Sequence, residues 1–248
     1  MVKTSGLGKN YQSFRAVDGL SLEVGSGEVY GLLGPNGAGK TTTLRMLATL
    51  LRPSAGSASV AGRDIQQEPL EVRKSLGIVN GGMKVYERLT GREVLEFFAG
   101  FYGLQDSFFE ERLAWAADLL KMDGILSKQV KEMSSGMQQK IVVARAILHQ
   151  PPVLLLDEAT AGLDVFARRS LLDFVKTYRS LGKTIVYSTH VMSEAEDVCD
   201  RVGFLHSGKL VWEGPLSKAM ECGSGSLERA FMRKLEEAIG DQSSARST

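Results

Sequence analysis

The fold of this chain is decided by Gly34-Pro35-Asn36-Gly37-Ala38-Gly39-Lys40-Thr41, which matches the pattern GxxxxGK(S/T). The segment lies between a predicted strand, 28–33, and a predicted helix, 42–51, which is the context that this motif requires. Glycines let backbone N–H groups turn inward around phosphate oxygens, and the N-terminus of the next helix adds positive potential. Lys40 can then reach the β- and γ-phosphates, and the Thr41 hydroxyl can ligate Mg²⁺. The motif predicts a site for a nucleoside triphosphate.

An acidic pair follows a fully apolar segment later in the chain. Residues 153–156 predict a buried strand, and Asp157 and Glu158 come directly after it. The carboxyl end of such a strand lies beside the phosphate loop in open α/β sheets. There Asp157 can hold Mg²⁺ through water, and Glu158 can polarise an attacking water as a general base. Together with the phosphate loop, the pair indicates a catalytic role rather than an ordinary strand end.

The composition fits an α/β enzyme. The chain has 248 residues, of which 43% are hydrophobic and 24% charged, and its net charge is +1. No global field therefore recruits nucleic acid or anionic lipid. The two cysteines, Cys199 and Cys222, form no CxxC pair, and the three histidines lack metal-ligand spacing, which argues against disulfide and zinc sites. No apolar run approaches the ~18 residues that a membrane span needs, so we expect a soluble chain.

Strand and helix patterns alternate over most of the sequence. The predicted strands are 17–24, 28–33, 57–60, 153–156, 184–188, 202–205 and 209–212, and the predicted helices outside the middle segment are 42–51, 166–181, 192–199 and 227–239. We expect an α/β fold: a P-loop NTPase core with a largely parallel sheet, flanking helices and antiparallel N-terminal strands. We expect a helical lobe at about 85–150 to be inserted into one domain over 1–221. We expect residues 222–248 to form a short C-terminal helix and a polar tail.

A third motif, Met133-Ser134-Ser135-Gly136-Met137, precedes a predicted helix, 141–149. By itself a Ser-Ser-Gly turn before a helix is an ordinary cap or an anion-binding helix end. Its place between the phosphate loop and the acidic strand favours a functional turn over an ordinary helix cap. Together with Ala161-Gly162-Leu163-Asp164 and Ser188-Thr189-His190, the motifs occur in the order and spacing of ABC ATPase domains, a family that the sequence resembles from residue 1 to about 221.

The resemblance implies roles for individual residues. In that family two domains pair head to tail, and ATP lies between the phosphate loop of one and the signature turn of the other. The implied nucleotide-binding residues are Tyr11, which stacks on adenine, and Gly34, Pro35, Asn36, Gly37, Ala38, Gly39, Lys40, Thr41 and Thr42. Thr41 and Asp157 are the implied magnesium ligands, and Ser134, Ser135, Gly136 and Met137 are the signature that meets the partner's ATP. Glu158 resembles the catalytic base, His190 the switch histidine, and Asp164 the residue that couples the two sites.

The resemblance also implies cofactors, partners and location. ATP and Mg²⁺ are the expected cofactors, and the expected partners are a second ABC ATPase subunit, identical or distinct, and an integral membrane permease, with no nucleic acid. The chain is then cytoplasmic and bound to the inner face of the cell membrane through its permease. Tyr86-Glu87-Arg88-Leu89-Thr90 and the Gly136-Met137 signature resemble type-2 exporter ATPases, most closely the NatA-type branch, which implies sodium or drug efflux.

Two alternatives come from other functional classes. A soluble ABC ATPase without a transporter, such as an iron–sulfur-assembly subunit, has a similar length, although its signature usually reads Ser-Gly-Gly-Glu. A P-loop kinase has no reason to carry a signature turn.

The sequence departs from the family pattern at two places. Ser135 adds a side chain where the signature normally has glycine, and Gly81 stands where the family carries a glutamine that ligates Mg²⁺. That ligand is missing, or is supplied by the neighbouring Asn80 or by water. The aromatic cluster Phe97, Phe98, Phe101 and Tyr102 could line a groove for the membrane partner, but we expect most of it in the core of the helical lobe, because aromatics usually pack inside.

Overall fold

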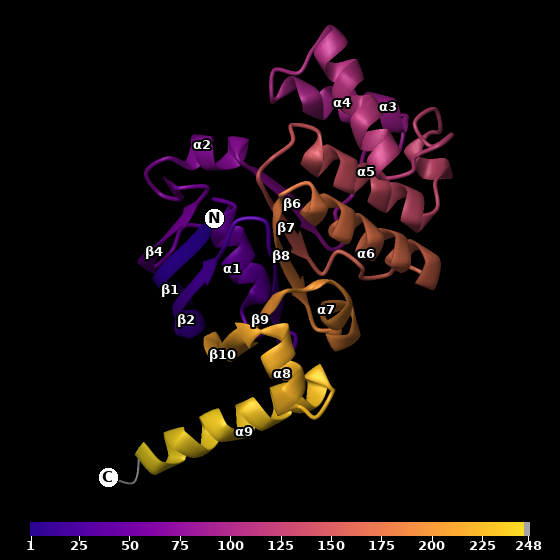
Figure 1. Cartoon of the computed structure of the whole chain (residues 1–248). Coiled ribbons are helices and arrows are strands. Elements are labelled where there is room, and N and C mark those ends of the chain that lie inside the picture. The colour runs from indigo at the N-terminus through magenta and orange to yellow at the C-terminus, as the bar shows by residue number, and fades with distance from the viewer. Residues whose placement is uncertain (246–248) are drawn as a thin grey trace.

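The computed structural model describes residues 1–245 and contains two sheets that lie next to each other (Figure 1). An antiparallel sheet has the order β2-β1-β4-β5, and a mostly parallel sheet has the order β10-β9-β3-β8-β7-β6. The first consists of β1 (Val2–Tyr11), β2 (Phe14–Val24), β4 (Ala55–Val60) and β5 (Arg63–Asp64). The second consists of β3 (Val29–Leu33), β6 (Leu76–Asn80), β7 (Val153–Asp157), β8 (Thr184–Thr189), β9 (Arg201–His206) and β10 (Lys209–Pro215).

Helices cover both faces of the parallel sheet and form a separate lobe. They are α1 (Lys40–Leu47), α2 (Pro69–Lys74), α3 (Gly91–Gly100), α4 (Asp106–Leu119), α5 (Ser135–Ile147), α6 (Val165–Ser180), α7 (Met192–Val198), α8 (Leu216–Cys222) and α9 (Leu227–Ala245). A short 3₁₀ turn spans Val130–Glu132. In Figure 1, α3 and α4 lie on the side of the molecule away from β1, β2 and β4, and α9 extends from the body toward the C-terminus.

The parallel sheet brings the ends of its central strands to one edge. β3, β7 and β8 are buried along their whole length, as the near-continuous apolar sequences of β3 and β7 predict. In the register of the ladders, Asn80 lies beside Asp157, and Asp157 lies beside Ser188. β3 also ends at this edge, where Leu33 is paired with Thr189, and the phosphate loop follows it directly. The polar residues of three strands therefore meet beside this loop.

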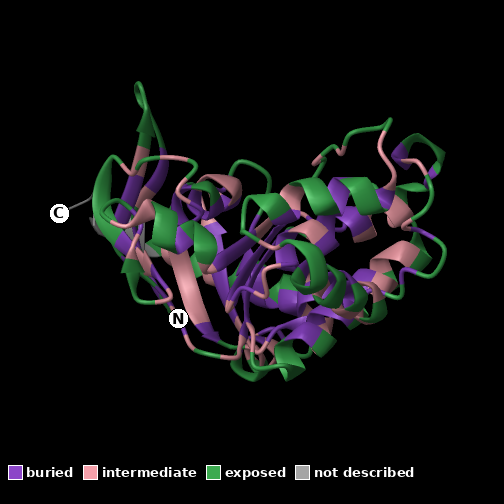
Figure 2. Cartoon of the chain, turned by 90° about the horizontal axis from the view of Figure 1, so that it is seen from above, coloured by how far each residue is buried: buried purple, intermediate pink, exposed green. Residues whose placement is uncertain are grey.

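The core is divided between the two faces of the parallel sheet. One cluster lies under the antiparallel sheet and includes Leu44 of α1 with Leu76, Val153 and Leu155. The other lies under α5, α6 and α7 and includes Leu154 and Leu156 together with the interior of the helical lobe. Figure 2 shows the buried residues gathered along the strands between these layers. The alternation along β7 assigns its odd-numbered residues, and hence Asp157, to the α1 face.

The helical lobe begins at a capping box. Thr90 Oγ1 accepts a hydrogen bond from the backbone N–H of Glu93, and the Glu93 carboxylate accepts one from the Thr90 N–H. This reciprocal pair satisfies two N–H groups that a helix start leaves unpaired. α4 buries Phe109, Leu113 and Ala116 at helical spacing.

The expectation that the aromatic cluster lies in the core of the lobe is wrong for most of its members. Phe97 is 50% exposed and Phe101 is 70% exposed, while Tyr102 is 38% exposed and only Phe98 packs against the core. The reason is the phase of α3, whose inward face is already occupied by Val94, Leu95 and Ala99. At 100° per residue, Phe97 and Phe101 are turned away from that face.

Most other elements agree with the sequence, and the α/β P-loop fold with its antiparallel N-terminal sheet is confirmed. β1, β5, β6, α2 and α8 were not expected, and the predicted strand 17–24 covers most of a longer β2. The C-terminal helix runs to Ala245, past the predicted end at 239. Residues 246–248 of the polar tail lie outside the described residues. Within residues 1–245, every helix is too short or too polar to cross a membrane.

Candidate functional site

The phosphate loop, residues 34–39, joins β3 to the N-terminus of α1. Gly39 caps this helix with φ 107°, a conformation that L side chains rarely adopt. A Cβ at Gly39 would also lie 2.5 Å from the Ala16 carbonyl oxygen of β2. Glycine is therefore required there both by the backbone angle and by the close approach of β2. The resulting turn points the first N–H groups of α1 into the loop.

Lys40 is almost fully buried, with 5% of its surface exposed. Its ammonium donates hydrogen bonds to the carbonyl oxygens of Gly34 at 2.7 Å and Pro35 at 3.1 Å, and lies 3.2 Å from Glu158 Oε1. These partners compensate a charge that burial would otherwise penalise. The ammonium is thus held over the loop, where an anion can compete for it.

Asp157 accepts two hydroxyl hydrogen bonds at the end of β7. Thr41 Oγ1 donates to its Oδ1 at 3.2 Å, and Ser188 Oγ donates to the same oxygen at 3.0 Å. Burial raises the pKa of Asp157 above its ordinary value, although the two hydroxyl bonds act in the opposite direction. A bound cation would relieve this desolvation. Ser188 belongs to the motif Ser188-Thr189-His190, but the sequence did not predict its contact with Asp157.

Glu158 and His190 form a close pair beside Lys40. The distance between Glu158 Oε2 and His190 Nδ1 is 2.7 Å. Glu158 has a φ of 50°, which is unusual for a residue with a side chain, and its N–H donates to the Ser188 carbonyl oxygen at 3.0 Å. Strained backbone of this kind collects at functional sites, where surrounding structure enforces it.

A cavity of about 230 Å³ lies over the phosphate loop. Its lining comprises Tyr11, Phe14, Ala16, Asn36, Gly37, Ala38, Gly39, Lys40, Thr41, Thr42 and Glu158. Tyr11 is 44% exposed at the end of β1, so the ring is available for stacking. Phe14, across the tight turn between β1 and β2, is a second exposed aromatic that the sequence did not suggest. Gly34 and Pro35 border a neighbouring hollow that also includes His190.

The signature turn lies elsewhere in this chain. Ser134 caps α5, and its Oγ accepts a hydrogen bond from the Met137 N–H at 3.3 Å. Ser135 begins the helix, and Gly136 packs so closely on α6 that a Cβ would lie 2.8 Å from Ala167 Cβ. None of Ser134, Ser135, Gly136 and Met137 lines the cavity over the phosphate loop. A single chain therefore does not bring these four residues to the cavity over its own phosphate loop.

Asp164 is the N-cap of α6, and its Oδ1 accepts a hydrogen bond from the Ala167 N–H at 2.8 Å. α6 therefore begins at the Asp164 cap and carries Ala167, against which Gly136 packs. Gln139 of α5 also donates to the Ala159 carbonyl oxygen at 2.8 Å, just after the acidic pair. These contacts connect the signature helix with the loop that carries Glu158.

Sequence reasoning missed Glu194, which is 3% exposed. Its Oε2 accepts hydrogen bonds from three hydroxyls: Thr160 at 3.0 Å, Tyr187 at 2.9 Å and Thr189 at 3.0 Å. The carboxylate ties the loop after Glu158 to the segment before His190. An acidic residue in a short polar helix gives no signal of such burial, because only the tertiary fold surrounds it with hydroxyls.

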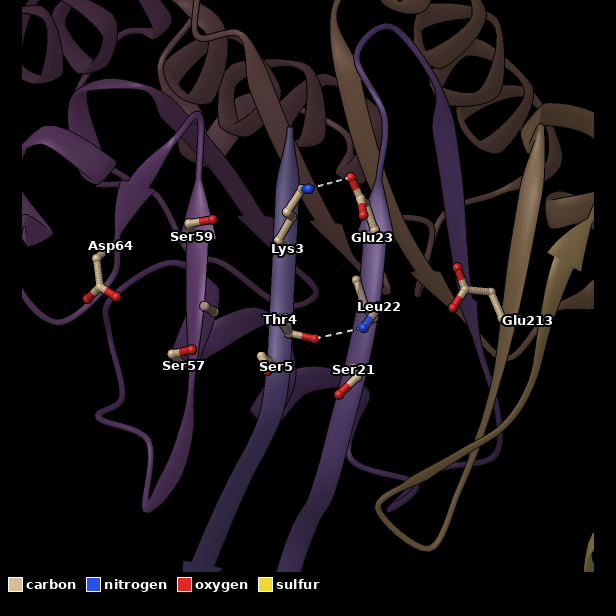
Figure 3. A pocket seen from close by; sticks show the side chains of 11 residues that line it. Lys3, Thr4, Ser5, Ser21, Leu22, Glu23, Ser57, Ser59, Asp64 and Glu213 are labelled. Atoms are coloured by element: carbon tan, nitrogen blue, oxygen red, sulfur yellow. Dashed lines mark hydrogen bonds and ion pairs between the residues drawn. The ribbon is translucent and has the colours of Figure 1, made fainter.

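A larger cavity, of about 640 Å³, lies on the outer face of the antiparallel sheet (Figure 3). Serines of β1, β2 and β4 line it, and Lys3 pairs with Glu23 at 2.7 Å between two exposed side chains. It contains none of the motif residues. The motif residues therefore line the smaller cavity over the phosphate loop rather than this larger one.

Comparisons with known proteins agree with the motifs. A family model described as ABC transporter matches residues 17–161. The chain is 39% identical over 227 residues to the ABC transporter ATP-binding protein NatA of Bacillus subtilis, covering 91% of this chain and 92% of that protein. It is 40% identical over 213 residues, 86% of this chain, to the daunorubicin/doxorubicin resistance ATP-binding protein DrrA of Streptomyces peucetius, of which it spans 64%.

Solved structures have the same fold. An ATP-binding subunit of an ABC transporter superposes with a TM-score of 0.84 at 29% identity, covering 95% of this chain and 99% of that one. The dimeric ATP-binding cassette MJ0796 bound to ADP and Pi superposes with a TM-score of 0.78 at 27% identity, covering 87% of this chain and 99% of that one. The expected resemblance to NatA-like exporter ATPases is confirmed. The chain therefore belongs to the ABC transporter family, as one of its ATPase subunits.

Proposed function

We propose that this chain hydrolyses ATP at a site completed by a second ATPase subunit, and that the cycle powers export through a separate membrane-spanning partner. One observation carries the hydrolytic part. The Glu158 carboxylate is held between Lys40 and His190 at the edge of the cavity over the phosphate loop. We assign the ATPase domain to residues 1–221, with the lobe at about 85–150 inserted, and treat residues 222–248 as an appendage.

Nucleotide binding changes the partners of Lys40. Phosphate oxygens carry more negative charge than the loop carbonyls that Lys40 now contacts, and the helix N-terminus favours anions at the same place. The ammonium therefore turns to the β- and γ-phosphates, and its pairing with Glu158 at 3.2 Å is weakened. This exchange leaves the Glu158 carboxylate available to a water molecule next to the γ-phosphate.

Glu158 acts as the general base, and His190 orients it. An ionised carboxylate only accepts hydrogen bonds, so His190 donates from Nδ1 and keeps Nε2 for the γ-phosphate or the water. The proton of the attacking water passes to the Glu158 carboxylate as the bond from the water oxygen to the γ-phosphorus forms and the bond from the γ-phosphorus to the bridging oxygen breaks, which releases ADP and phosphate. Tyr11, which lines the cavity, stacks on the adenine.

The residues at the end of β7 fit Mg²⁺. Thr41 and Asp157 offer a hydroxyl and a carboxylate oxygen 3.2 Å apart, and hard oxygen ligands together with phosphates are what Mg²⁺ prefers. When bound, the ion neutralises charge that develops on the phosphates. The hydrogen bond from Ser188 holds the Asp157 carboxylate in place for this contact.

The distance of the signature from the phosphate loop supports a composite site. Ser134 and the N-terminus of α5 have an anion-binding character, yet they do not line this chain's own cavity. A head-to-tail second subunit would place its signature over the γ-phosphate. The dimeric state named for solved relatives at 26–27% identity supports this arrangement. The second subunit is another copy of this chain or a distinct ATPase.

An exposed aromatic face supports a protein partner at the helical lobe. We define the α3 aromatic surface as Tyr86, Phe97, Phe98 and Phe101, whose rings contact one another at centroid distances from 5.3 to 6.0 Å. Exposed clustered aromatics mark protein interaction sites. We propose that a cytoplasmic helix of the permease packs here, so that the chain is held at the inner face of the cell membrane.

Export, rather than another ABC function, is supported by the names of relatives. They include a drug resistance protein, a probable multidrug transporter and a Nod factor export protein. These names refer to transport, export or drug resistance rather than to iron–sulfur assembly. The permease selects the cargo, with sodium or drugs as the proposed classes.

The hydrolytic role is tested with Glu158→Gln. We expect the variant to bind ATP, to hydrolyse it about 10²–10⁴-fold more slowly, and to form an ATP-dependent dimer. The matched control is Glu111→Gln, which changes an exposed carboxylate on α4 and should leave turnover unchanged. Wild-type turnover in Glu158→Gln would contradict the assignment of the base.

The transport role is tested by purification from native membranes. Tagged Glu158→Gln, loaded with ATP, is isolated from detergent-solubilised membranes and its partners are identified by mass spectrometry. A polytopic membrane protein is expected. Recovery of soluble assembly factors alone would favour the non-transport ATPase instead.

A further inference from the structure

The loop after β6 leaves no room for a side chain at Gly81. The Gly81 N–H donates to the Asp157 carbonyl oxygen at 2.6 Å, so the loop is pressed against the acidic segment. A Cβ on Gly81 would lie 2.9 Å from the Glu158 carbonyl oxygen and 3.4 Å from Glu158 Cβ. A glutamine at this position would require the backbone of the catalytic segment to move. A ligand from this loop must therefore come from another residue.

Asn80 occupies the neighbouring position on β6, beside Asp157 in the ladder. Residues paired in register on adjacent strands project to the same face of the sheet. Leu76 and Ile78 of β6 pack in the cluster under the antiparallel sheet, on the α1 face, and Asn80 follows them at the same period of two. Its amide is thus on the face where Asp157 contacts Thr41.

The Asn80 amide oxygen is buried and has no hydrogen-bond partner. Buried polar atoms of proteins are normally paired, and an unpaired one next to a catalytic carboxylate points to a ligand. The amide oxygen is a neutral, hard donor of the kind that binds Mg²⁺ and its coordinated waters. Thr41, Asp157 and Asn80 then present a hydroxyl, a carboxylate and an amide oxygen to one region from α1, β7 and β6.

We propose that Asn80 replaces the loop glutamine and contributes its side-chain oxygen to the coordination sphere of the nucleotide-bound magnesium ion. This inference rests on the proposed function, because the ion arrives with ATP. It also gives the loop a connection to the site. The segment after β6 runs from Asn80 through Met83 to Tyr86, so a short stretch of backbone connects the proposed metal ligand with the α3 aromatic surface.

The test measures metal binding without turnover. Glu158→Gln carrying Asn80→Ala is titrated with Mn²⁺ in the presence of ATP, and free Mn²⁺ is followed by electron paramagnetic resonance. We expect Mn²⁺ affinity to fall about tenfold or more, while the affinity for ATP measured by calorimetry in EDTA stays unchanged. The control is Gln66→Ala, which removes an exposed amide and should change neither quantity.

A second variant separates a ligand from a structural amide. Asn80→Asp keeps an oxygen at the same place and should bind Mn²⁺ more tightly than the parent, because a second carboxylate strengthens the site once the ion is present. Unchanged Mn²⁺ affinity in Asn80→Ala, or weaker affinity in Asn80→Asp, would overturn the proposal. Asp157→Asn is the positive control. If it also left Mn²⁺ binding intact, the nucleotide–metal site itself would be misassigned.

Discussion

Lys40 is the residue on which nucleotide affinity depends most directly. It is buried, positively charged and already held over the loop by carbonyl oxygens of Gly34 and Pro35. Lys40→Ala removes a charge-assisted contact with phosphate, and contacts of this kind contribute about 1.5–3 kcal/mol. We expect ATP affinity to fall about 10- to 100-fold in isothermal titration calorimetry. Lys218→Ala, on the exposed side of α8, is the matched control, and equal affinity in the two variants would contradict the role of the loop lysine.

His149 makes the stability of the fold depend on pH. Its ring stacks on Tyr102 at 3.8 Å with an interplanar angle of 7°, and Nε2 lies 3.2 Å from the Leu76 carbonyl oxygen. Burial lowers the pKa of His149 to about 4. The unfolded state therefore binds a proton first as the pH falls below about 6.5, and the folded state loses stability between that pH and about 4.

The free energy of unfolding is expected to fall by roughly 3 kcal/mol at the acid end of this pH window. It is measured by urea unfolding at a series of pH values. His149→Gln keeps a polar side chain that does not titrate, so its stability should change less over the same window. A parallel decline in both proteins would assign the effect to other groups.

At the scale of the element, α3 packs into the lobe with one face and exposes aromatic side chains on another. Its inward face holds Val94, Leu95 and Ala99, whereas Phe97 and Phe101 are exposed. We expect Phe97→Ser and Phe101→Ser to change the free energy of unfolding by about 1 kcal/mol or less, because little buried surface is lost. The same variants should lose the permease in co-purification from membranes.

The comparison variant for this helix surface is Phe109→Ala in α4. Phe109 is 3% exposed in the core of the lobe, so its truncation should destabilise the protein by about 3–5 kcal/mol. Strong destabilisation by Phe101→Ser would show that this aromatic ring is a packing residue after all. Retained permease binding in both serine variants would remove the α3 aromatic surface from the docking site.

At the scale of the whole molecule, the separation of the signature from the phosphate loop gives a prediction about assembly. Ser134 caps α5 away from the cavity over its own phosphate loop. Ser134→Glu adds a negative charge where the partner's γ-phosphate would arrive, and like charges brought together at an interface are strongly unfavourable. In the Glu158→Gln background we expect ATP affinity of the monomer to be unchanged and the ATP-dependent dimer to disappear in size-exclusion chromatography.

Ser127→Glu is the matched charge control, since Ser127 is an exposed serine of the same lobe, outside the signature. It should leave the dimer intact. A Ser134→Glu protein that still forms the dimer with ATP would mean that the subunits do not meet through the signature.

Much of the fold and part of the site follow from the sequence because their signals are local. Residues 34–41 are consecutive, and their glycines, lysine and threonine specify a turn and a helix start at the place where they occur. Ser134 and Asp164 are likewise helix caps, which depend on the next three residues only. The apolar strand before Asp157 is recognisable because strands of a parallel sheet that are covered on both faces often read as continuous apolar runs.

The tertiary structure alone decided which distant residues meet and which faces are covered. Three contacts join segments that are far apart in the chain. Ser188 donates to Asp157, hydroxyls surround Glu194, and Tyr11 lines the cavity over the phosphate loop. The sequence shows that Gly81 leaves a ligand missing and offers Asn80 or water in its place, but only the ladder register and the closeness of the Glu158 backbone favour Asn80. The exposure of Phe101 depends on the rotation of α3 against its neighbours. Local patterns specify backbone conformation, whereas burial and contact are set by the packing of all elements together.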